Sequence, residues 1–164
     1  MLSATLERFD HPDYTLMVGV YRNDPATCAA VQEIAARDSR VVPVEVPCAG
    51  PTTKADCLNH LYGALVRLEA DLGKRAAAVV LHDAEDLVHP LELRVLAAAL
   101  PTAAAVQLPV VPLLDAKSPW IGGHYGDEFA ESHGKDLLVR QAVGAAVPLA
   151  GVGCAIRRDA LAKL

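Results

Sequence analysis

The sequence predicts an α/β domain with a mainly parallel sheet. Through the first 110 residues, short apolar runs of strand length alternate with segments of helical periodicity. Strands that alternate with helices in this way form parallel sheets covered by those helices. A chain of 164 residues with 52% hydrophobic residues is also long enough to bury the core of one domain.

The first strand is expected at residues 16–20, an apolar run that ends in the turn Tyr21-Arg22-Asn23-Asp24-Pro25. Within this turn, Asp24 is suited to cap a helix and Pro25 to occupy its first position. The helix that follows has one apolar face, formed by Cys28, Val31, Ile34 and Ala35.

The second strand is expected at residues 41–46, where Pro43 indicates an irregular or edge position. A Pro/Gly/Thr loop at 47–53 leads into a strongly periodic helix that Gly73 is suited to end. Its apolar stripe consists of Leu58, Leu61, Tyr62, Leu65, Leu68 and Leu72.

The remaining elements follow the same alternation as far as residue 111. In chain order we expect a strand at 77–82, a helix from Pro90 to about Leu100, a strand at 106–111, a Pro/Gly-rich loop at 112–126, a polar helix containing Asp127, Glu128, Glu131 and Asp136, a strand at 152–156 and a helix near Asp159. Residues 1–14 are expected to be a lead-in segment and 15–164 the domain itself.

Composition argues against several classes of protein. The net charge of −5 and the absence of a Lys/Arg cluster argue against nucleic-acid binding. The four cysteines show no CxxC spacing, so neither a zinc site nor a disulfide framework is indicated. No signal peptide and no apolar run of membrane-spanning length is present, so we expect a soluble, cytoplasmic segment.

Three acids follow the third predicted strand within four positions: Asp83, Glu85 and Asp86. Right-handed crossovers would bring the loops after Val20, Val46 and Leu81 to one edge of the sheet, where ligands of open α/β sheets bind. Crowded carboxylates repel one another unless a cation lies between them. Mg²⁺ or Mn²⁺ prefers such oxygen ligands and commonly bridges to phosphates. The sequence contains neither GxGxxG nor GxxxxGK[ST], so a Rossmann site and a P-loop are not indicated.

Four segments, in this order and spacing, resemble the motifs of family 2 glycosyltransferases, which have the three-layer α/β/α GT-A fold. They are Tyr21-Arg22-Asn23-Asp24, Lys54-Ala55-Asp56-Cys57-Leu58-Asn59, Asp83-Ala84-Glu85-Asp86, and Gly151 to Leu161 with its Arg157-Arg158 pair. The runs 82–86 and 127–136 are similar to those of a narrower group, the glycosyltransferase domains of inner-membrane proteins associated with phage adsorption, which are related to cellulose-synthase-type enzymes.

The resemblance implies a role for each candidate residue. Asp83 and Glu85 would form a DxD-like pair for Mn²⁺ or Mg²⁺, with Asp83 also near the ribose and Asp86 supporting them. Lys54 would meet the diphosphate of a nucleotide sugar, most simply a UDP-sugar. Gly151 and Gly153 would let the backbone approach the acceptor saccharide or the sugar. The base or ribose would be contacted by Tyr21, Asn23 and Asp24.

The sequence departs from the family pattern in two places. After the second strand, Val46-Pro47-Cys48-Ala49-Gly50 lacks the acid that reads the nucleobase in many members. The general base that inverting transfer requires belongs to a motif expected beyond Leu164. The chain is therefore expected to be a truncated, donor-binding part of a longer protein. That protein is expected at the cytoplasmic face of the inner membrane, and only segments outside this chain would contact the membrane.

Two other functions remain open at this stage. His82-Asp83 and His89 flank the acids and would also suit a metal-dependent phosphohydrolase. A non-catalytic interaction module that kept the fold would agree with the expected lack of a base. Several candidate residues also have a purely structural interpretation: Asp24 as a helix cap, Gly151 and Gly153 as turn glycines, and the acids as a solvated turn.

Overall fold

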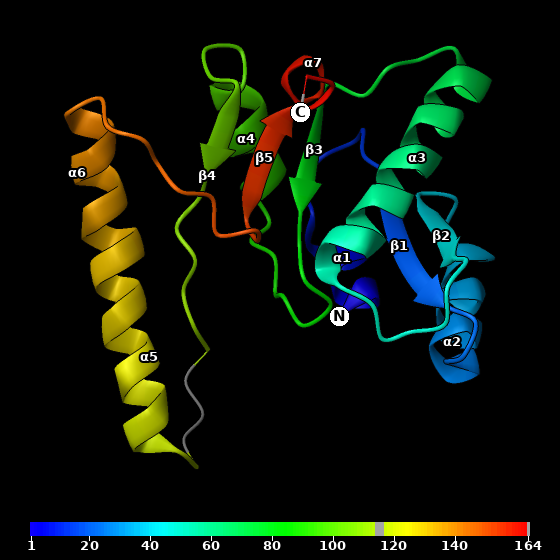
Figure 1. Cartoon of the computed structure of the whole chain (residues 1–164), viewed down its shortest axis with the longest axis horizontal. Helices are drawn as coiled ribbons and strands as arrows, with labels where there is room; N and C mark the ends of the chain where they lie inside the picture. The colour runs from blue at the N-terminus through cyan, green and yellow to red at the C-terminus, as the bar shows by residue number, and fades with distance from the viewer. Residues whose placement is uncertain (114–116, 164) are drawn as a thin grey trace. The chain divides into compact units, whose positions relative to one another are not determined.

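The computed structural model describes residues 1–113 and 117–163 of the chain (Figure 1). The chain divides into two compact units, which are described one at a time. The first unit consists of residues 10–76, and the second of residues 1–9 together with 77–164. Residues 114–116 of the loop predicted at 112–126, and residue 164, lie outside the described residues.

The first unit is built on two parallel strands, β1 (Leu16–Tyr21) and β2 (Val41–Val46). They pair in register from Leu16 opposite Val41 to Tyr21 opposite Val46. Helix α2 (Pro25–Ala35) connects the two strands, and α3 (Lys54–Leu72) follows β2. The buried side chains of this unit are nearly all valines, which suit a pleated, covered surface: Val20, Val31, Val41, Val44 and Val46.

The two helices of this unit lie on opposite faces of the strands. A Cβ on Gly19 would collide with the Sγ atom of Cys57 on α3, so α3 approaches β1 closely on that face. Val20 points to the opposite face and borders a cavity with Cys28 of α2. The helix–strand–helix layering expected of an α/β/α fold is therefore present within this unit.

Local signals explain where these helices begin and end. Asp24 caps α2 by accepting a hydrogen bond from the Thr27 N–H at 3.1 Å, and Thr53 caps α3 in the same way through Asp56 N–H at 3.2 Å. Gly73 ends α3 at a positive φ of 60°, a conformation that glycine adopts without steric cost.

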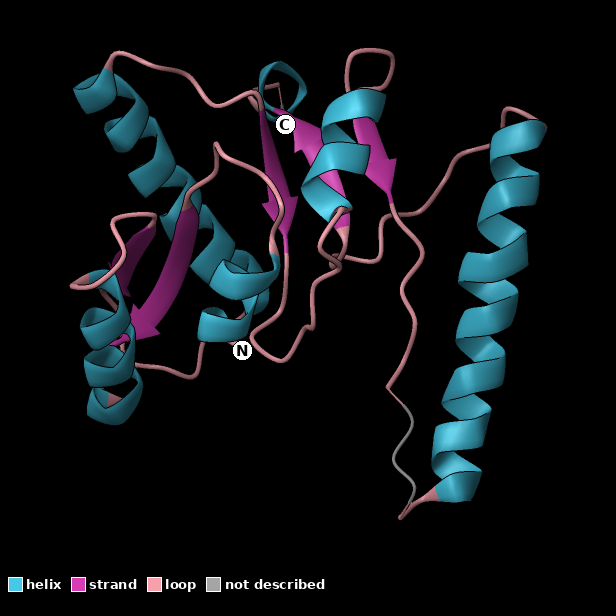
Figure 2. Cartoon of the chain, turned by 180° about the vertical axis from the view of Figure 1, so that it is seen from behind, coloured by secondary structure: helices cyan, strands magenta, loops and turns pink. Residues whose placement is uncertain are grey.

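The second unit contains a three-stranded sheet with the order β3 (Ala78–Leu81), β5 (Cys154–Arg157) and β4 (Ala105–Gln107). β5 lies between the other two strands and runs antiparallel to both. Helix α4 (Glu92–Ala99) packs on this sheet (Figures 1 and 2). The core consists of Leu96, Leu100 and Ala155, with Ala78, Val80, Val106 and Leu108 around them.

Two short helices and one long helix complete the second unit. α1 (Leu2–Arg8) precedes the strands and α7 (Arg158–Leu161) follows β5. α5 (Pro119–Glu131), the π-helical segment η1 (Ser132–Asp136) and α6 (Leu137–Ala142) form one continuous helix (Figure 2). His133 in η1 is buried and its Nδ1 atom accepts a hydrogen bond from the Val110 N–H at 3.3 Å.

The predicted mixed α/β class is confirmed, with helices and a parallel strand pair as in a GT-A-like domain. The strand at 41–46, the start of α2 and both ends of α3 are confirmed closely. The predicted strand at 106–111 is shorter, ending at Gln107 because the chain reaches Pro109, which has no N–H to donate to a ladder.

One prediction of non-regular structure was wrong. Residues 119–126 of the predicted loop belong to α5, because Pro119 is well placed at a helix start and glycines weaken a helix without preventing it. Part of the lead-in segment 1–14, for which no secondary structure was predicted, forms α1, and Thr5 and Phe9 are buried in the second unit. The assignment of a single domain at 15–164 stays a prediction.

In the described part of the chain, no helix has both the length and the apolar character that a bilayer crossing requires.

The core assignment predicts a large effect for Leu96, whose side chain is 1% exposed. Leu96→Ala should lower the free energy of unfolding by about 2–5 kcal/mol, because it leaves a cavity between α4 and the sheet. Leu138→Ala, at a position that is 64% exposed, should change it by less than about 0.5 kcal/mol. Urea denaturation followed by circular dichroism measures both, and equal losses would contradict the assignment.

Candidate functional site

The acidic turn, residues 83–86, begins two residues after the end of β3 in the second unit. It is closed by the Asp86 N–H, which donates to the Asp83 carbonyl at 3.2 Å, and by the Asp86 carboxylate, which accepts from the Asp83 N–H at 2.8 Å. Asp83 is half-buried and Glu85 exposed. The three acids therefore have different roles: the Asp86 side chain bonds inward to the turn, whereas Glu85 extends into solvent.

His82 connects this turn to helix α4. Its Nδ1 atom lies 3.3 Å from the Asp86 carboxylate and its Nε2 atom 2.8 Å from Oε1 of Glu92. The Glu92 side chain is 7% exposed and occupies the first turn of α4, where the helix dipole favours an acid. Both Nε2 and Oε1 are buried and no other described group hydrogen-bonds to either of them, so each is the other's polar neighbour, and the two side chains form an ion pair when the imidazole is protonated.

The two carboxylates change the acidity of His82. Burial of the imidazole lowers its pKa, but Glu92 and Asp86 together raise it by more, so the pKa of His82 lies above its ordinary value of 6.5. With a carboxylate facing each ring nitrogen, neither nitrogen is directed toward an open position that a metal could occupy. The phosphohydrolase alternative, which required His82 as a metal ligand, therefore gains no support from this arrangement.

Phe9, which directly follows α1, lies beside His82, and α1 also contacts the segment before α4. The Phe9 ring centroid is 6.3 Å from the imidazole centroid, and Phe9 is itself buried. Arg8 donates a hydrogen bond to the carbonyl of Val88 at 3.4 Å, and Val88 is 3% exposed. The lead-in segment thus belongs to the surroundings of the acidic turn, which no periodicity in residues 1–14 had indicated.

The acidic turn would offer a metal two carboxylates, which is not a complete set of ligands. Among the described residues, no group of three His, Cys, Asp or Glu side chains is arranged to hold an ion. Mg²⁺ in nucleotide sites is commonly held by one or two carboxylates together with phosphate oxygens and water. Asp83 and Glu85 fit that pattern if a diphosphate provides the remaining ligands.

Gly151 and Gly153 lie at the entry to β5, next to the end of β3. Both have positive φ, 81° and 58°, which explains the choice of glycine at this turn. The Gly153 N–H donates to the Leu81 carbonyl at 2.9 Å, and its carbonyl accepts from the Leu108 N–H at 2.9 Å. The structure thus brings Gly153 and the acidic turn to neighbouring positions, while contact with an acceptor stays a prediction.

Gln107, which the sequence analysis missed, holds the same turn from β4. Its amide nitrogen donates to the Val152 carbonyl at 2.9 Å, and its amide oxygen accepts from the Ala150 N–H at 2.7 Å. A polar residue inside an otherwise apolar run was the only signal of this role.

In the first unit, Tyr21 and Asn23 bind the loop between β2 and α3. The amide group of Asn23 donates to the Gly50 carbonyl and accepts from the Gly50 N–H, both at 2.7 Å. The Tyr21 hydroxyl lies 2.7 Å from the Thr52 hydroxyl, and a Cβ on Gly50 would come within 2.9 Å of the Tyr21 ring. Tyr21 and Asn23 therefore shape this loop, and their predicted contact with a nucleoside stays a prediction.

The other predicted residues of the first unit lie at helix starts. The Asp24 carboxylate accepts from both the N–H and the hydroxyl of Thr27, which holds the pKa of Asp24 below its ordinary value. Lys54 is exposed at the first position of α3, directly after the loop that Asn23 and Tyr21 bind. The N-terminal end of a helix of 19 residues carries partial positive charge, which adds to that of the lysine.

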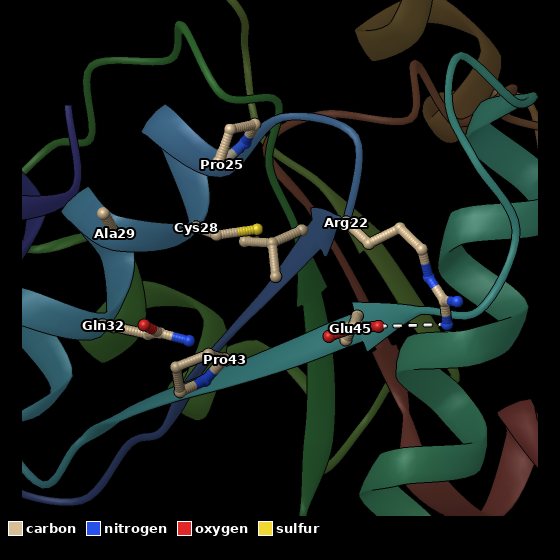
Figure 3. A pocket seen from close by; sticks show the side chains of 8 residues that line it. Arg22, Pro25, Cys28, Ala29, Gln32, Pro43 and Glu45 are labelled. Atoms are coloured by element: carbon tan, nitrogen blue, oxygen red, sulfur yellow. Dashed lines mark ion pairs between the residues drawn. The ribbon is translucent and has the colours of Figure 1, made fainter.

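A cavity of about 450 Å³ lies between α2 and the strands of the first unit (Figure 3). Its lining includes Cys28, Gln32 and Pro43, and Arg22 and Glu45 form an ion pair of 3.2 Å across one side. Glu45 is the exposed penultimate residue of β2 between two buried valines, an alternation visible in the sequence. The absence of an acid at 46–50, where many family members read the nucleobase, stays a prediction about base recognition.

The predicted site residues fall into two groups. Tyr21, Asn23, Asp24 and Lys54 belong to the first unit, and Asp83, Glu85, Gly151 and Gly153 to the second. Within the first unit, Tyr21 and Asn23 fix the loop that leads to Lys54. Within the second unit, Gly153 bonds to Leu81, two residues before Asp83. The expected convergence of the two groups stays a prediction, since the units are described separately.

Known proteins and protein families are similar in sequence to this chain. A model of the family described as "Glycosyltransferase like family 2" matches residues 1–164. The chain is 40% identical, over 163 residues, to "Bacteriophage adsorption protein B" of Escherichia coli (strain K12), and equally to "Bacteriophage N4 adsorption protein B" of Escherichia coli O157:H7. Each match covers 99% of this chain but only 22% of the relative. No solved structure matches the chain significantly.

The position of His82 predicts how stability depends on pH. Because its folded pKa is raised, the ion pair stabilises the fold fully below the unfolded value of about 6.5, and this contribution is lost as pH rises through the higher folded pKa. The free energy of unfolding, measured by urea denaturation between about pH 6 and pH 9, should therefore fall with rising pH.

His82→Gln should remove this fall, because the neutral amide does not titrate. His124→Gln, at an exposed position in α5, serves as the matched control and should retain it. An unchanged pH profile in His82→Gln would show that other groups cause the dependence.

Proposed function

The chain belongs to glycosyltransferase family 2, and on this basis we propose that it binds the nucleotide-sugar donor of a glycosyltransferase through a divalent cation. The donor that we propose is a UDP-sugar, and the cation Mn²⁺ or Mg²⁺. The single observation that carries the proposal is the acidic turn, in which one carboxylate holds the turn closed while Asp83 and Glu85 occupy its half-buried and exposed positions.

Transfer of a sugar from a nucleoside diphosphate leaves negative charge on the departing diphosphate. A cation at Asp83 and Glu85 supplies the neutralisation of that charge when bound. The protein's part is to hold two carboxylates on a closed turn at the end of a strand, so that little ordering is required when the donor arrives.

Lys54 provides a second positive group for the diphosphate in this proposal. It is exposed at the start of α3, and the loop before it is fixed by three short hydrogen bonds from Asn23 and Tyr21. A lysine on an ordered helix start binds phosphate both by its ammonium group and by the neighbouring backbone N–H groups.

We further propose inverting transfer to a saccharide acceptor in a longer parent protein, with the parent at the cytoplasmic face of the inner membrane. This proposal rests on the resemblance of the runs 82–86 and 127–136 to those of inner-membrane proteins associated with phage adsorption. No catalytic base is assigned among residues 1–164, and its expected position beyond Leu164 stays a prediction. If a full-length protein binds the donor without transferring or hydrolysing it, the non-catalytic interaction module is the better description.

Calorimetric titration with UDP, in the presence and absence of Mn²⁺, tests the proposed donor site. UDP should bind only weakly without Mn²⁺, and the double variant Asp83→Ala/Glu85→Ala should lose at least about tenfold in affinity for UDP with Mn²⁺, since even outer partners of metal ligands contribute that much. Glu33→Ala, which removes an exposed carboxylate from α2, is the control. Metal-independent binding, or an unchanged affinity in the double variant, would refute the metal site.

Substitution of Lys54 tests the proposed diphosphate contact. Lys54→Ala should weaken UDP binding by about tenfold, the value of a charged hydrogen bond, and should leave uridine binding unchanged, because uridine has no phosphate. Lys135→Ala, an exposed lysine on η1, should affect neither ligand. An equal loss for UDP and uridine would place Lys54 elsewhere than at the phosphates.

A further inference from the structure

Glu92 is a buried carboxylate that the proposed function does not use directly. Its side chain is 7% exposed, and its Oε1 atom faces Nε2 of His82 at 2.8 Å. Farther along α4, Leu96 and Leu100 contribute to the apolar core. An apolar side chain at position 92 would be buried at a lower free-energy cost than a carboxylate. Removing a charge from water costs roughly several kcal/mol, even when the charge is paired.

A chain of contacts runs from Glu92 to the residues proposed to hold the cation. Glu92 faces one nitrogen of His82, and the other nitrogen lies 3.3 Å from the Asp86 carboxylate. The same Asp86 oxygen accepts the hydrogen bond from the Asp83 N–H at 2.8 Å. Each group in this chain is oriented by the one before it, and the last is the backbone of Asp83.

The contacts on the other side of His82 leave the ring little freedom. Its side chain is 19% exposed, and the Phe9 ring lies beside it with centroids 6.3 Å apart. Without the Glu92 carboxylate, Nε2 of the ring would lose its ion pair, which is the contact that fixes the ring's rotation. Asp86 would then lose a partner that holds its carboxylate against the Asp83 N–H.

We infer that Glu92 is a positioning residue, which acts through His82 and Asp86 to fix the acidic turn that presents Asp83 and Glu85. The effect of Glu92 on cation binding rests on the proposed function, whereas its effect on the turn does not. Residues that orient metal ligands in this way commonly raise the affinity for the metal by roughly 10–100-fold.

The variant Glu92→Gln tests the inference with two separate measurements. The first is hydrogen exchange of the Asp83 amide by NMR in the ligand-free protein, which should quicken about tenfold as Asp86 loses its fixed partner. The second is the Kd for UDP in the presence of Mn²⁺, which should rise about tenfold. Glu33→Gln, at an exposed position of α2, is the matched control and should change neither.

A double variant distinguishes positioning from a general loss of stability. If Glu92 acts through His82, Glu92→Gln added to His82→Gln should quicken Asp83 exchange little beyond His82→Gln alone. Exchange at amides of β4 and β5 should follow global stability in every variant and provides the reference. Exchange of the Asp83 amide at the wild-type rate in Glu92→Gln, or full additivity in the double variant, would overturn the inference.

The outcomes also separate this inference from the proposed function. Faster Asp83 exchange in Glu92→Gln, together with no Mn²⁺-dependent UDP binding by the wild-type protein, would support the positioning role and refute the donor site. If Glu92→Gln does not fold, Glu92→Asp replaces it, since it keeps the charge but is shorter by one methylene. Faster Asp83 exchange is expected there too, and a wild-type rate would overturn the inference.

Discussion

The ion pair between His82 and Glu92 is the interaction on which the order of the second unit's acidic turn depends. It joins the end of β3 to the start of α4, and Asp86 extends it to the backbone of Asp83. Two charges of opposite sign are buried together, an arrangement that contributes little net stability but penalises any geometry that separates them. These contacts therefore favour the conformation in which the structure shows the turn after β3.

In the first unit, neutral side chains hold the loop between β2 and α3. Asn23 uses both atoms of its amide on the backbone of Gly50, and Tyr21 packs on Gly50 and reaches Thr52. Two of the four segments that resemble family motifs, 21–24 and 83–86, thus contain residues that bind the protein's own loops. Rigidly held loops of this kind suit a binding site, because a site needs groups that fix the backbone as well as groups that contact a ligand.

Much of the fold could be predicted from the sequence because local physics decides it. Asp24 and Pro25 specify a helix start wherever they occur, and Gly73 is suited to the positive φ that ends α3. The direction of β5 could not be predicted, because a strand's partners are set by residues distant in the sequence. For the same reason the lead-in gave no sign that Phe9 would pack against His82, more than 70 residues away in the chain.

The sequence by itself determined which residue types are present and in what order: a lysine at a helix start, and three acids after an apolar strand. It could not distinguish among the three acids, since they are chemically alike. Only the tertiary structure decided that Asp86 bonds inward while Glu85 is exposed, because that division depends on where His82 and Glu92 lie. Periodicity reports which face of an element is buried, whereas the partner of a buried charge is fixed by the packing of separate elements.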